Sequence, residues 1–208
     1  MKIDVNNVNR YHSMKVELLS ITENAEQLIE LAGRTAYQSQ NRITEDSSKK
    51  FITTLVKMGH ESVLEHASAT FKISGISRAC SHQLVRHRLA SFTQRSQRYV
   101  SEKEFEYVEP ESIKNNEAAH IIFNSVIQYS NVSYKALKDL GIKNEDCRSI
   151  LPNACTTELI ITSNLREFRH IILLRNSKFA QEEIKLLSKE ILKILKKNAP
   201  NCFFDLEV

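Results

Sequence analysis

Glycine is scarce in this chain, with four residues among 208. The sequence contains neither G-x-G-x-x-G nor G-x-x-x-x-G-K-[ST], so a glycine-rich loop does not hold any nucleotide that the protein binds. Side chains would have to bind the phosphates instead. Arginine suits that task, because its planar guanidinium matches the geometry of phosphate oxygens.

Cysteine is also sparse, and the four residues are scattered at Cys80, Cys147, Cys155 and Cys202. The absence of a C-x-x-C pair argues against a zinc site built from cysteines. A disulfide framework is not expected in a chain of this length. We therefore expect a reducing, cytoplasmic location.

Long apolar runs are missing as well. The longest are short stretches such as IILL, and the opening MKIDVNNVNR lacks the apolar segment of a signal peptide. The net charge of +4 is mild. It suits anionic small molecules and is weak support for a nucleic-acid partner. We expect neither a membrane nor a nucleic acid as partner.

Residue patterns predict an α+β fold: a single domain, 1–208, of long helices packed on a small, mostly antiparallel sheet. No repeat, linker or low-complexity segment divides the chain. Strands are predicted at 14–21, 66–75 and 156–163, with extended chain at 91–100. Helices are predicted at 22–33, 44–59, 76–90, 118–141, 145–152, 165–175 and 180–199. Thr44 and Asn164 are the expected N-caps, and Gly33 is an expected helix end.

The segment RHRLASFTQRSQRY, residues 86–99, gathers arginines with serine and glutamine. In extended chain, Gln94, Ser96 and Arg98 would share one face. An amide, a hydroxyl and a guanidinium can together bind a phosphate and a polar base. A solvated edge strand explains the same pattern, and spacing alone does not decide between the two.

Helical geometry applies to the residues before this segment. Arg78, His82 and Arg86 are spaced four apart and would lie along one helical face. Arg86 and Arg88 would point to nearly opposite sides unless the helix ends there.

The same segment contains R-H-R, seven residues, and then Ser96. This pattern resembles the signature of flavin-dependent thymidylate synthase. Further stretches resemble that family in the same order: GHESVLEHASATF, SRACSHQLVRHR, RSILP, TSNLREFRHIILLR and AQEEI. The likeness extends from about Gly59 to Ile184.

The resemblance implies conversion of dUMP to dTMP. The methylene group would come from methylenetetrahydrofolate, and a hydride would come from NADPH by way of bound FAD. It also implies a homotetramer whose active sites combine residues of several subunits. All four small molecules are anionic, which would explain the concentration of arginine.

By resemblance, a set of residues binds FAD: His66, Ser68, Arg86, His87, Arg88, Gln94, Asn164, Leu165, Arg166 and His170. A second set binds dUMP: Gln83, Leu84, Val85, Arg86, Gln94, Arg95, Ser96, Gln97, Arg98, Arg148 and Arg175. Plainer roles remain open for several of these residues. His66 would be a core histidine, Asn164 a helix cap, Arg148 a partner of Asp146, and Arg175 a cation at a helix C-terminus.

Arg175 is the expected catalytic residue. A fixed cation beside the pyrimidine stabilises negative charge as it develops on the ring. The resemblance implies no cysteine nucleophile, so Cys147 is not assigned that role. The chain departs from some relatives at Gln94, where they carry an acidic residue, and at Phe179, where they carry histidine.

Other classes of function were weighed. A nucleic-acid binder would use the basic segment, but its aromatic residues form no stacking platform. A metal-dependent hydrolase would need a site drawn from the histidines, namely His60, His66, His82, His87 and His170. Their spacings match no common zinc pattern, so no metal is expected. A flavoprotein of other chemistry is the remaining alternative.

Overall fold

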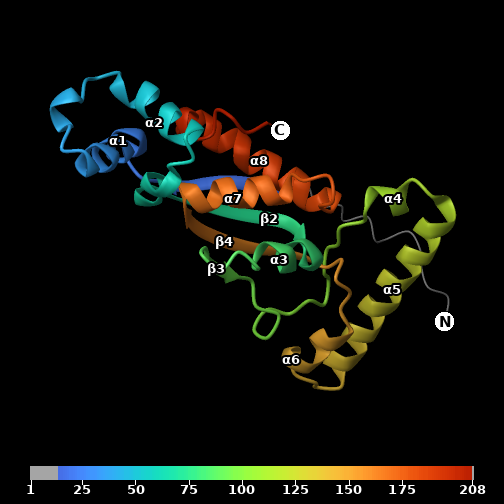
Figure 1. Cartoon of the computed structure of the whole chain (residues 1–208). Helices are drawn as coiled ribbons and strands as arrows, with labels where there is room; N and C mark the ends of the chain where they lie inside the picture. Colours follow the sequence, from blue (N-terminus) through green and yellow to red (C-terminus); the bar gives the residue numbers. More distant parts are fainter. Residues whose placement is uncertain (1–13, 208) are drawn as a thin grey trace. The chain divides into compact units, whose positions relative to one another are not determined.

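The computed structural model describes residues 14–207, in which helices and four strands follow one another as Figure 1 shows. The strands are β1 Lys15–Ile21, β2 Ser68–Ser77, β3 Ser91–Gln94 and β4 Thr156–Asn164. The α-helices are α1 Ala25–Ala36, α2 Ser47–Lys57, α3 Arg78–Leu84, α4 Glu111–Lys114, α5 Glu117–Asp139, α6 Asn144–Cys147, α7 Leu165–Arg175 and α8 Glu182–Asn198. Short 3-10 helices are η1 Gln40–Arg42, η2 Glu61–His66, η3 Arg148–Ile150 and η4 Pro200–Cys202.

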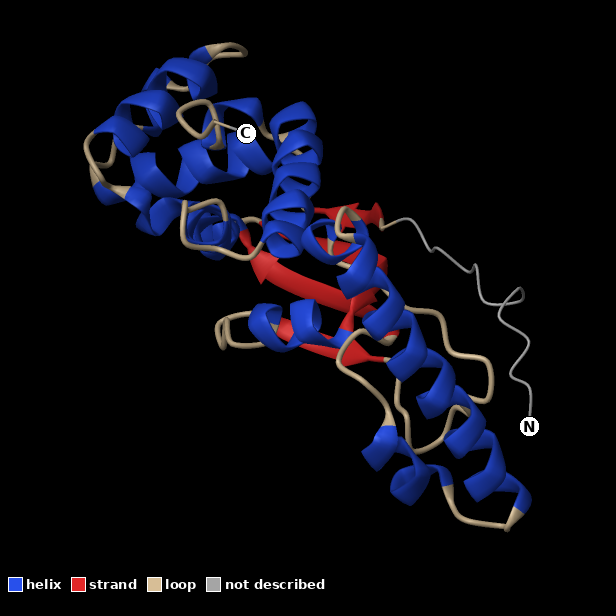
Figure 2. Cartoon of the chain, turned by 90° about the vertical axis from the view of Figure 1, so that its right-hand side faces the viewer, coloured by secondary structure: helices blue, strands red, loops and turns tan. Residues whose placement is uncertain are grey.

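The strands form one antiparallel sheet in the order β1-β2-β4-β3, drawn in red in Figure 2. A hydrogen bond of 3.0 Å between the hydroxyls of Thr70 and Thr162 joins β2 to β4. The α+β class with a small antiparallel sheet is therefore confirmed. The boundary of a single domain over 1–208 stays a prediction.

Contacts group the described residues into two compact units. The first comprises Ser74–Gln83, Gln94–Leu159 and residues 14–15. The second comprises Val16–Ile73, Leu84–Thr93 and residues 160–207. Among the described helices, none is long and apolar enough to cross a membrane.

The core of the second unit follows the helical periodicity of α8. Ile184, Leu187, Ile191 and Leu195 are all buried, as the sequence predicts. The ring of Phe71 on β2 meets the ring of Phe168 on α7 edge-on, with 5.3 Å between centroids. The inner face of α7 is thereby fixed against the sheet, which sets the direction of its polar residues.

The first unit has its own apolar cluster. Phe105, Tyr107 and Cys155 pack with Ile127 of α5. The hydroxyl of the buried Tyr134 accepts the backbone N–H of Glu102 at 3.1 Å. The long helix α5 is therefore anchored to the loop that precedes it.

Two predicted helix boundaries in the second unit were wrong. Helix α1 passes through Gly33 and ends at Ala36. A Cβ at Gly33 would lie 2.7 Å from the Phe51 ring, so this glycine serves the close packing of α1 on α2. Thr44 does not cap α2, because that helix begins at Ser47, whose hydroxyl accepts the Thr44 N–H at 2.9 Å.

The segment around the arginines also differs from its prediction. Helix α3 ends at Leu84, so Arg86 does not continue the helical face of Arg78 and His82. Strand β3 ends at Gln94, so the alternation expected for Ser96 and Arg98 does not hold. Local hydrogen bonds explain this, because the Val100 N–H bonds the Ser96 carbonyl at 3.0 Å and turns the chain.

Candidate functional site

The R-H-R triplet lies in a turn just after α3. The His87 N–H donates to the Leu84 carbonyl at 3.2 Å, and the Ala90 N–H donates to the His87 carbonyl at 3.1 Å. This turn buries His87 to 5% exposure and leaves Arg86 and Arg88 exposed. The helix predicted over 76–90 is therefore shorter than expected and ends at Leu84, before the R-H-R triplet.

His87 is the centre of a cluster of four side chains in the second unit, with Glu167, His170 and Arg175 from α7. The Arg175 Nε donates to the His87 Nε2 at 2.9 Å. The other ring nitrogen, Nδ1, lies 3.5 Å from the Glu167 Oε1. The His170 ring meets the His87 ring edge-on at 5.7 Å. We call these four residues the His87 cluster.

Burial sets the electrostatics of the His87 cluster. It lowers the pKa of His87 to about 4, helped by the positive charge of Arg175 and by His170. His87 is therefore neutral at physiological pH. Burial also raises the pKa of Glu167, against the opposite influence of His170.

A hollow of about 360 Å³ lies beside the His87 cluster in the same unit. Its walls combine apolar and charged residues: Glu61, Glu65, Leu89, Asn164, Arg166, Glu167, His170 and Leu173. Asn164 caps α7, its Oδ1 accepting the Glu167 N–H at 2.8 Å, which confirms the predicted cap. The exposed Arg166 pairs with Glu65. The hollow is lined by one arginine, one histidine and three glutamates, so an anionic ligand would have to displace Glu65 from Arg166.

His87, Glu167 and His170 also offer donor atoms within 4.8 Å of one another, a distance suited to a metal ion. The structure thus brings together two of the five histidines considered in the sequence. The hydrogen bond from Arg175 disfavours a metal there. It uses the lone pair of Nε2 and so directs the ring proton to Nδ1, the atom that faces Glu167.

Arginines form a second cluster in the first unit. The Arg95 Nη2 donates to the Thr156 carbonyl at 2.8 Å and to the Glu102 carboxylate at 3.2 Å. Burial raises the pKa of Glu102, while the charge of Arg95 lowers it. Arg78 and Arg148 line a separate hollow with His82 and the buried Gln97. Four polar side chains, two of them guanidinium groups, suit a phosphate.

The face expected for Gln94, Ser96 and Arg98 is not formed. The Gln94 amide donates to the hydroxyls of Ser81 at 2.9 Å and Thr157 at 3.1 Å. Arg98 reaches outward to Glu145 at 3.0 Å. These residues serve different contacts within the first unit.

The other predicted site residues occupy varied positions. His66 and Ser68 are exposed, at the end of η2 and the start of β2. Leu84 and Leu165 are fully buried, so any contact they make with a ligand must come from the main chain. Gln83 and Val85 are half-buried.

Two more positions were singled out in the sequence. Arg148 is exposed and donates to the Glu145 carbonyl at 3.2 Å. Phe179 is exposed, with the Lys178 ammonium 5.0 Å from its ring centre.

The residues predicted to bind FAD or dUMP are divided between the two units. Gln83, Gln94–Arg98 and Arg148 belong to the first unit, whereas Leu84, Val85, Arg86 and Arg175 belong to the second. Within the second unit, the structure brings His87, Asn164, Arg166, His170 and Arg175 to one region of the fold.

Sequence reasoning missed Glu167 and Glu102. Glu167 stands three residues after the predicted cap Asn164, the spacing of a capping box, in which its side chain would return to the backbone. It faces His87 instead. Glu102 lies in a charged stretch that is typical of a loop. The spacing of its residues does not predict that Glu102 is buried.

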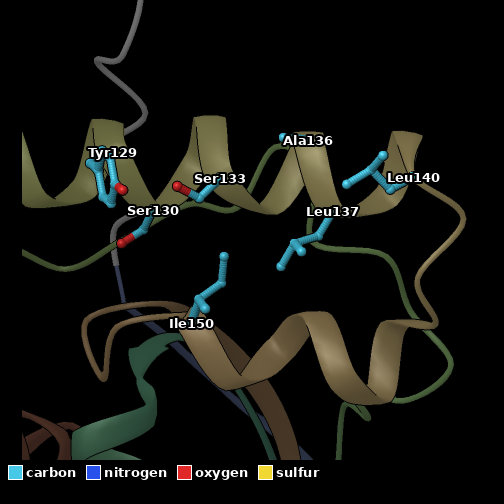
Figure 3. Close-up of a pocket in the computed structure, with 7 residues that line it drawn as sticks. All are labelled: Tyr129, Ser130, Ser133, Ala136, Leu137, Leu140 and Ile150. Carbon is cyan, nitrogen blue, oxygen red and sulfur yellow. The ribbon is translucent and has the colours of Figure 1, made fainter.

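An apolar hollow between α5 and Ile150 of η3 is shown in Figure 3. Leu137 and Leu140 line it together with the hydroxyl groups of Tyr129 and Ser133. No cationic side chain is among its lining residues. It is therefore a poor fit for a phosphate-bearing ligand.

Comparisons with known proteins identify the family of this chain. The sequence pattern of the family described as thymidylate synthase complementing protein matches residues 17–201. A flavin-dependent thymidylate synthase of Geobacter sulfurreducens is 43% identical over 200 residues, which is 92% of this chain and 86% of that protein.

Solved structures share the fold. Thymidylate synthase X of Helicobacter pylori, with FAD and dUMP, aligns with a TM-score of 0.78 and 26% identity over 93% of this chain and 98% of that one. A UMP/dUMP methylase of Streptomyces cacaoi, bound with 5-Br dUMP, aligns with a TM-score of 0.80 over 92% of this chain and 93% of its own. Its 22% identity supports a shared fold alone.

Proposed function

This chain belongs to the family of flavin-dependent thymidylate synthases, and from that premise we propose that it methylates dUMP to dTMP. FAD is its bound cofactor, methylenetetrahydrofolate the carbon donor and NADPH the reductant. The observation that carries the proposal is the pairing of Arg175 with a buried, neutral His87.

The donor set of the second unit fits FAD. Arg86, Arg88 and Arg166 are exposed cations, and His170 lies beside the same hollow as Arg166. Arginine binds the oxygens of a pyrophosphate through paired N–H groups. Arg166 must exchange Glu65 for such a ligand, and it can do so because both side chains are about half exposed. When bound, FAD would supply the hydride chemistry, while the protein supplies orientation and charge.

Arg175 would act on the pyrimidine of dUMP. Negative charge develops on the ring as its carbon attacks, and a guanidinium held nearby stabilises that charge. The Nε of Arg175 is fixed by His87, so the guanidinium is oriented before the substrate binds. A preoriented donor needs no rearrangement when the charge develops.

One hollow of the first unit suits a phosphate such as that of dUMP. Arg78, Arg148 and Gln97 line one hollow there, and the Arg78 Nη1 lies 3.5 Å from the Arg95 carbonyl. An ionised Glu102 offsets the charge of Arg95, which keeps the cluster from repelling itself. Arg148 is exposed, so it is accessible to a ligand.

We propose further that the enzyme is a homotetramer in the cytoplasm. Several large apolar side chains of α5 are exposed, among them Ile121, Ile122, Val126 and Tyr129. Exposed apolar surface of this kind marks protein interfaces. If an isolated single chain retained full affinity for FAD and full turnover, the tetramer would not be needed.

The experiment follows the flavin directly. The purified protein is loaded with FAD and mixed without oxygen with NADPH, in the presence and absence of dUMP. The proposal predicts bleaching of the flavin absorbance, faster with dUMP. Arg175→Ala should retain FAD but form dTMP at least 100-fold more slowly, a factor of the size expected for loss of one charge-stabilising donor at roughly 2.7 kcal/mol or more. A protein that takes up no FAD would overturn the proposal.

A further inference from the structure

We propose that Glu167 is a positioning residue whose carboxylate holds His87 in its Nδ1-protonated tautomer, so that His87 fixes the guanidinium of Arg175. The contacts Glu167–His87–Arg175 all lie within this chain. Only their last consequence, the orientation of Arg175 toward a pyrimidine, rests on the proposed function.

The first step is the bond between Arg175 and His87. The Nε of arginine carries a hydrogen at every accessible pH and can only donate. It lies 2.9 Å from the His87 Nε2, so that nitrogen must present a lone pair. A neutral imidazole with a lone pair on Nε2 carries its single proton on Nδ1. In a protonated ring, Nε2 would also carry a hydrogen. Two N–H groups would then face each other, and the hydrogen bond from Arg175 would be lost.

The second step is the place of the Nδ1 proton. Nδ1 lies 3.5 Å from the Glu167 Oε1, and the two side chains are only 3% and 7% exposed. The distance exceeds the usual N–H···O length of about 2.9 Å, so the attraction is mainly that between a carboxylate and a polar N–H in a poorly solvated place. Contacts between functional groups are often long before the ligand binds and shorten in the complex.

The third step is how the fold holds Glu167. Glu167 stands in the first turn of α7, where its N–H is bound by the cap residue Asn164 at 2.8 Å. Arg175 is the last residue of the same helix. His87 comes from the turn after α3 and contacts both of these side chains. The helix thus sets the spacing of the two groups that hold the ring.

A structural role for Glu167 is the competing explanation. A negative charge in the first turn of a helix stabilises the helix through its dipole, whatever it faces. Glu182 provides a matched comparison, because it is exposed and occupies the first turn of α8, where it pairs with Lys185 at 3.8 Å. The two roles differ in what they do to the His87 ring.

The deciding measurement is the tautomer of His87 in the protein without ligands. Histidine labelled with 15N is incorporated, and the ring nitrogens are observed by long-range nitrogen–proton correlation at pH 7.5. The His87 signals are identified by their loss in His87→Gln. The proposal predicts a protonated Nδ1 and an unprotonated Nε2. A protonated Nε2 would overturn it.

Variants then test the role of the carboxylate. Glu167→Gln keeps an acceptor oxygen but loses the charge, and it should keep the Nδ1-protonated tautomer as its major form. Glu167→Ala removes the acceptor and should give a mixture of tautomers and about tenfold or more lower turnover, the factor expected when a buried donor loses its partner. Glu182→Ala should change neither. If Glu167→Ala retains the parent tautomer and turnover, or merely lowers thermal stability as Glu182→Ala does, the proposal is wrong.

Failure of this proposal is distinct from failure of the proposed function. The tautomer is read without FAD, dUMP or turnover, so it can be confirmed in a protein that makes no dTMP. If Glu167→Ala does not fold, the tautomer of the parent still decides. A protonated Nε2 in the parent would contradict the proposal.

Discussion

At the scale of single residues, burial decides what the cysteines can do. Cys80, Cys147, Cys155 and Cys202 are free thiols and all are buried. Burial raises the pKa of Cys155 and of Cys202 to about 12. A thiol attacks as its thiolate, so these two groups are inert at neutral pH. For Cys80 and Cys147, the absence of a nucleophilic role stays a prediction.

The role of Cys147, which precedes Arg148 in the chain, can be tested by substitution. Cys147→Ala should retain flavin reduction and dTMP formation within about threefold, because no covalent bond to this sulfur is required. Its removal leaves a small cavity and should lower the free energy of unfolding by about 1 kcal/mol. Turnover and urea unfolding check these results. A loss of turnover beyond 100-fold, with the stability intact, would contradict them.

His87 shows what a sequence reveals about one residue and what it does not. The R-H-R triplet singled out His87, and the resemblance implied that it binds FAD. Its neighbours could not be read from spacing, because Arg175 is 88 residues away in the chain. The contact depends on how α7 packs, which is a property of the fold.

At the scale of elements, the cap of α7 carries two roles that a substitution can separate. Asn164→Ala removes the side-chain acceptor and should cost about 1 kcal/mol, or roughly 2–4 °C in the thermal midpoint. Asn164→Ser retains an acceptor and should retain the midpoint. If the amide also contacts FAD, both variants should raise the dissociation constant for FAD several-fold.

Asn116 supplies the control for that experiment. It caps α5, its Oδ1 accepting the Ala119 N–H at 3.1 Å. Asn116→Ala should lower the midpoint by a similar amount and leave the affinity for FAD unchanged. Should Asn164→Ser bind FAD as the parent does, Asn164 acts as a cap alone. Calorimetry and flavin titration provide the two readouts.

Element boundaries were predictable where local chemistry alone sets them. Asn164 starts α7 as expected, and Gly141, with φ at +80°, follows the end of α5. The predicted helix end at Gly33 was wrong because this glycine is needed for close packing against Phe51 of another helix. That contact between helices is not visible in the local sequence. The turn after Leu84 likewise depends on hydrogen bonds that no periodicity announces.

At the scale of the whole molecule, His87 links stability to pH. Its pKa is about 4 in the fold and near 6.5 in the unfolded chain. Between these values the unfolded state binds a proton that the folded state does not, so stability falls as the pH is lowered through this window. The free energy of unfolding should be about 2 kcal/mol lower at pH 5 than at pH 7 from this group.

Two histidine variants test that pH dependence. His87→Gln should flatten the difference between pH 7 and pH 5, as measured by urea unfolding. His82→Gln changes an exposed histidine and should leave the difference as it is in the parent. Equal pH dependence in the parent and in His87→Gln would show that His87 is not the group responsible.

The class of the fold was predictable from the whole sequence, whereas the grouping of its parts was not. The amphipathic periodicity of a helix such as α8 results from burial of one helix face, and it can be recognised in the sequence alone. The division of the arginine-rich stretch between two units could not be recognised from the sequence. Residues 86–99 were treated as one site, but Arg86 to Thr93 and Gln94 to Tyr99 make their contacts in different units.

One measurement tests the central claim most directly: the detection of dTMP. The purified protein is incubated with FAD, NADPH, methylenetetrahydrofolate and dUMP, and the nucleotides are separated and identified by mass. We predict dTMP in the complete mixture and none when FAD or methylenetetrahydrofolate is left out. Unchanged dUMP in the complete mixture, with FAD bound and reduced, would contradict the account and point to another flavin chemistry on this fold.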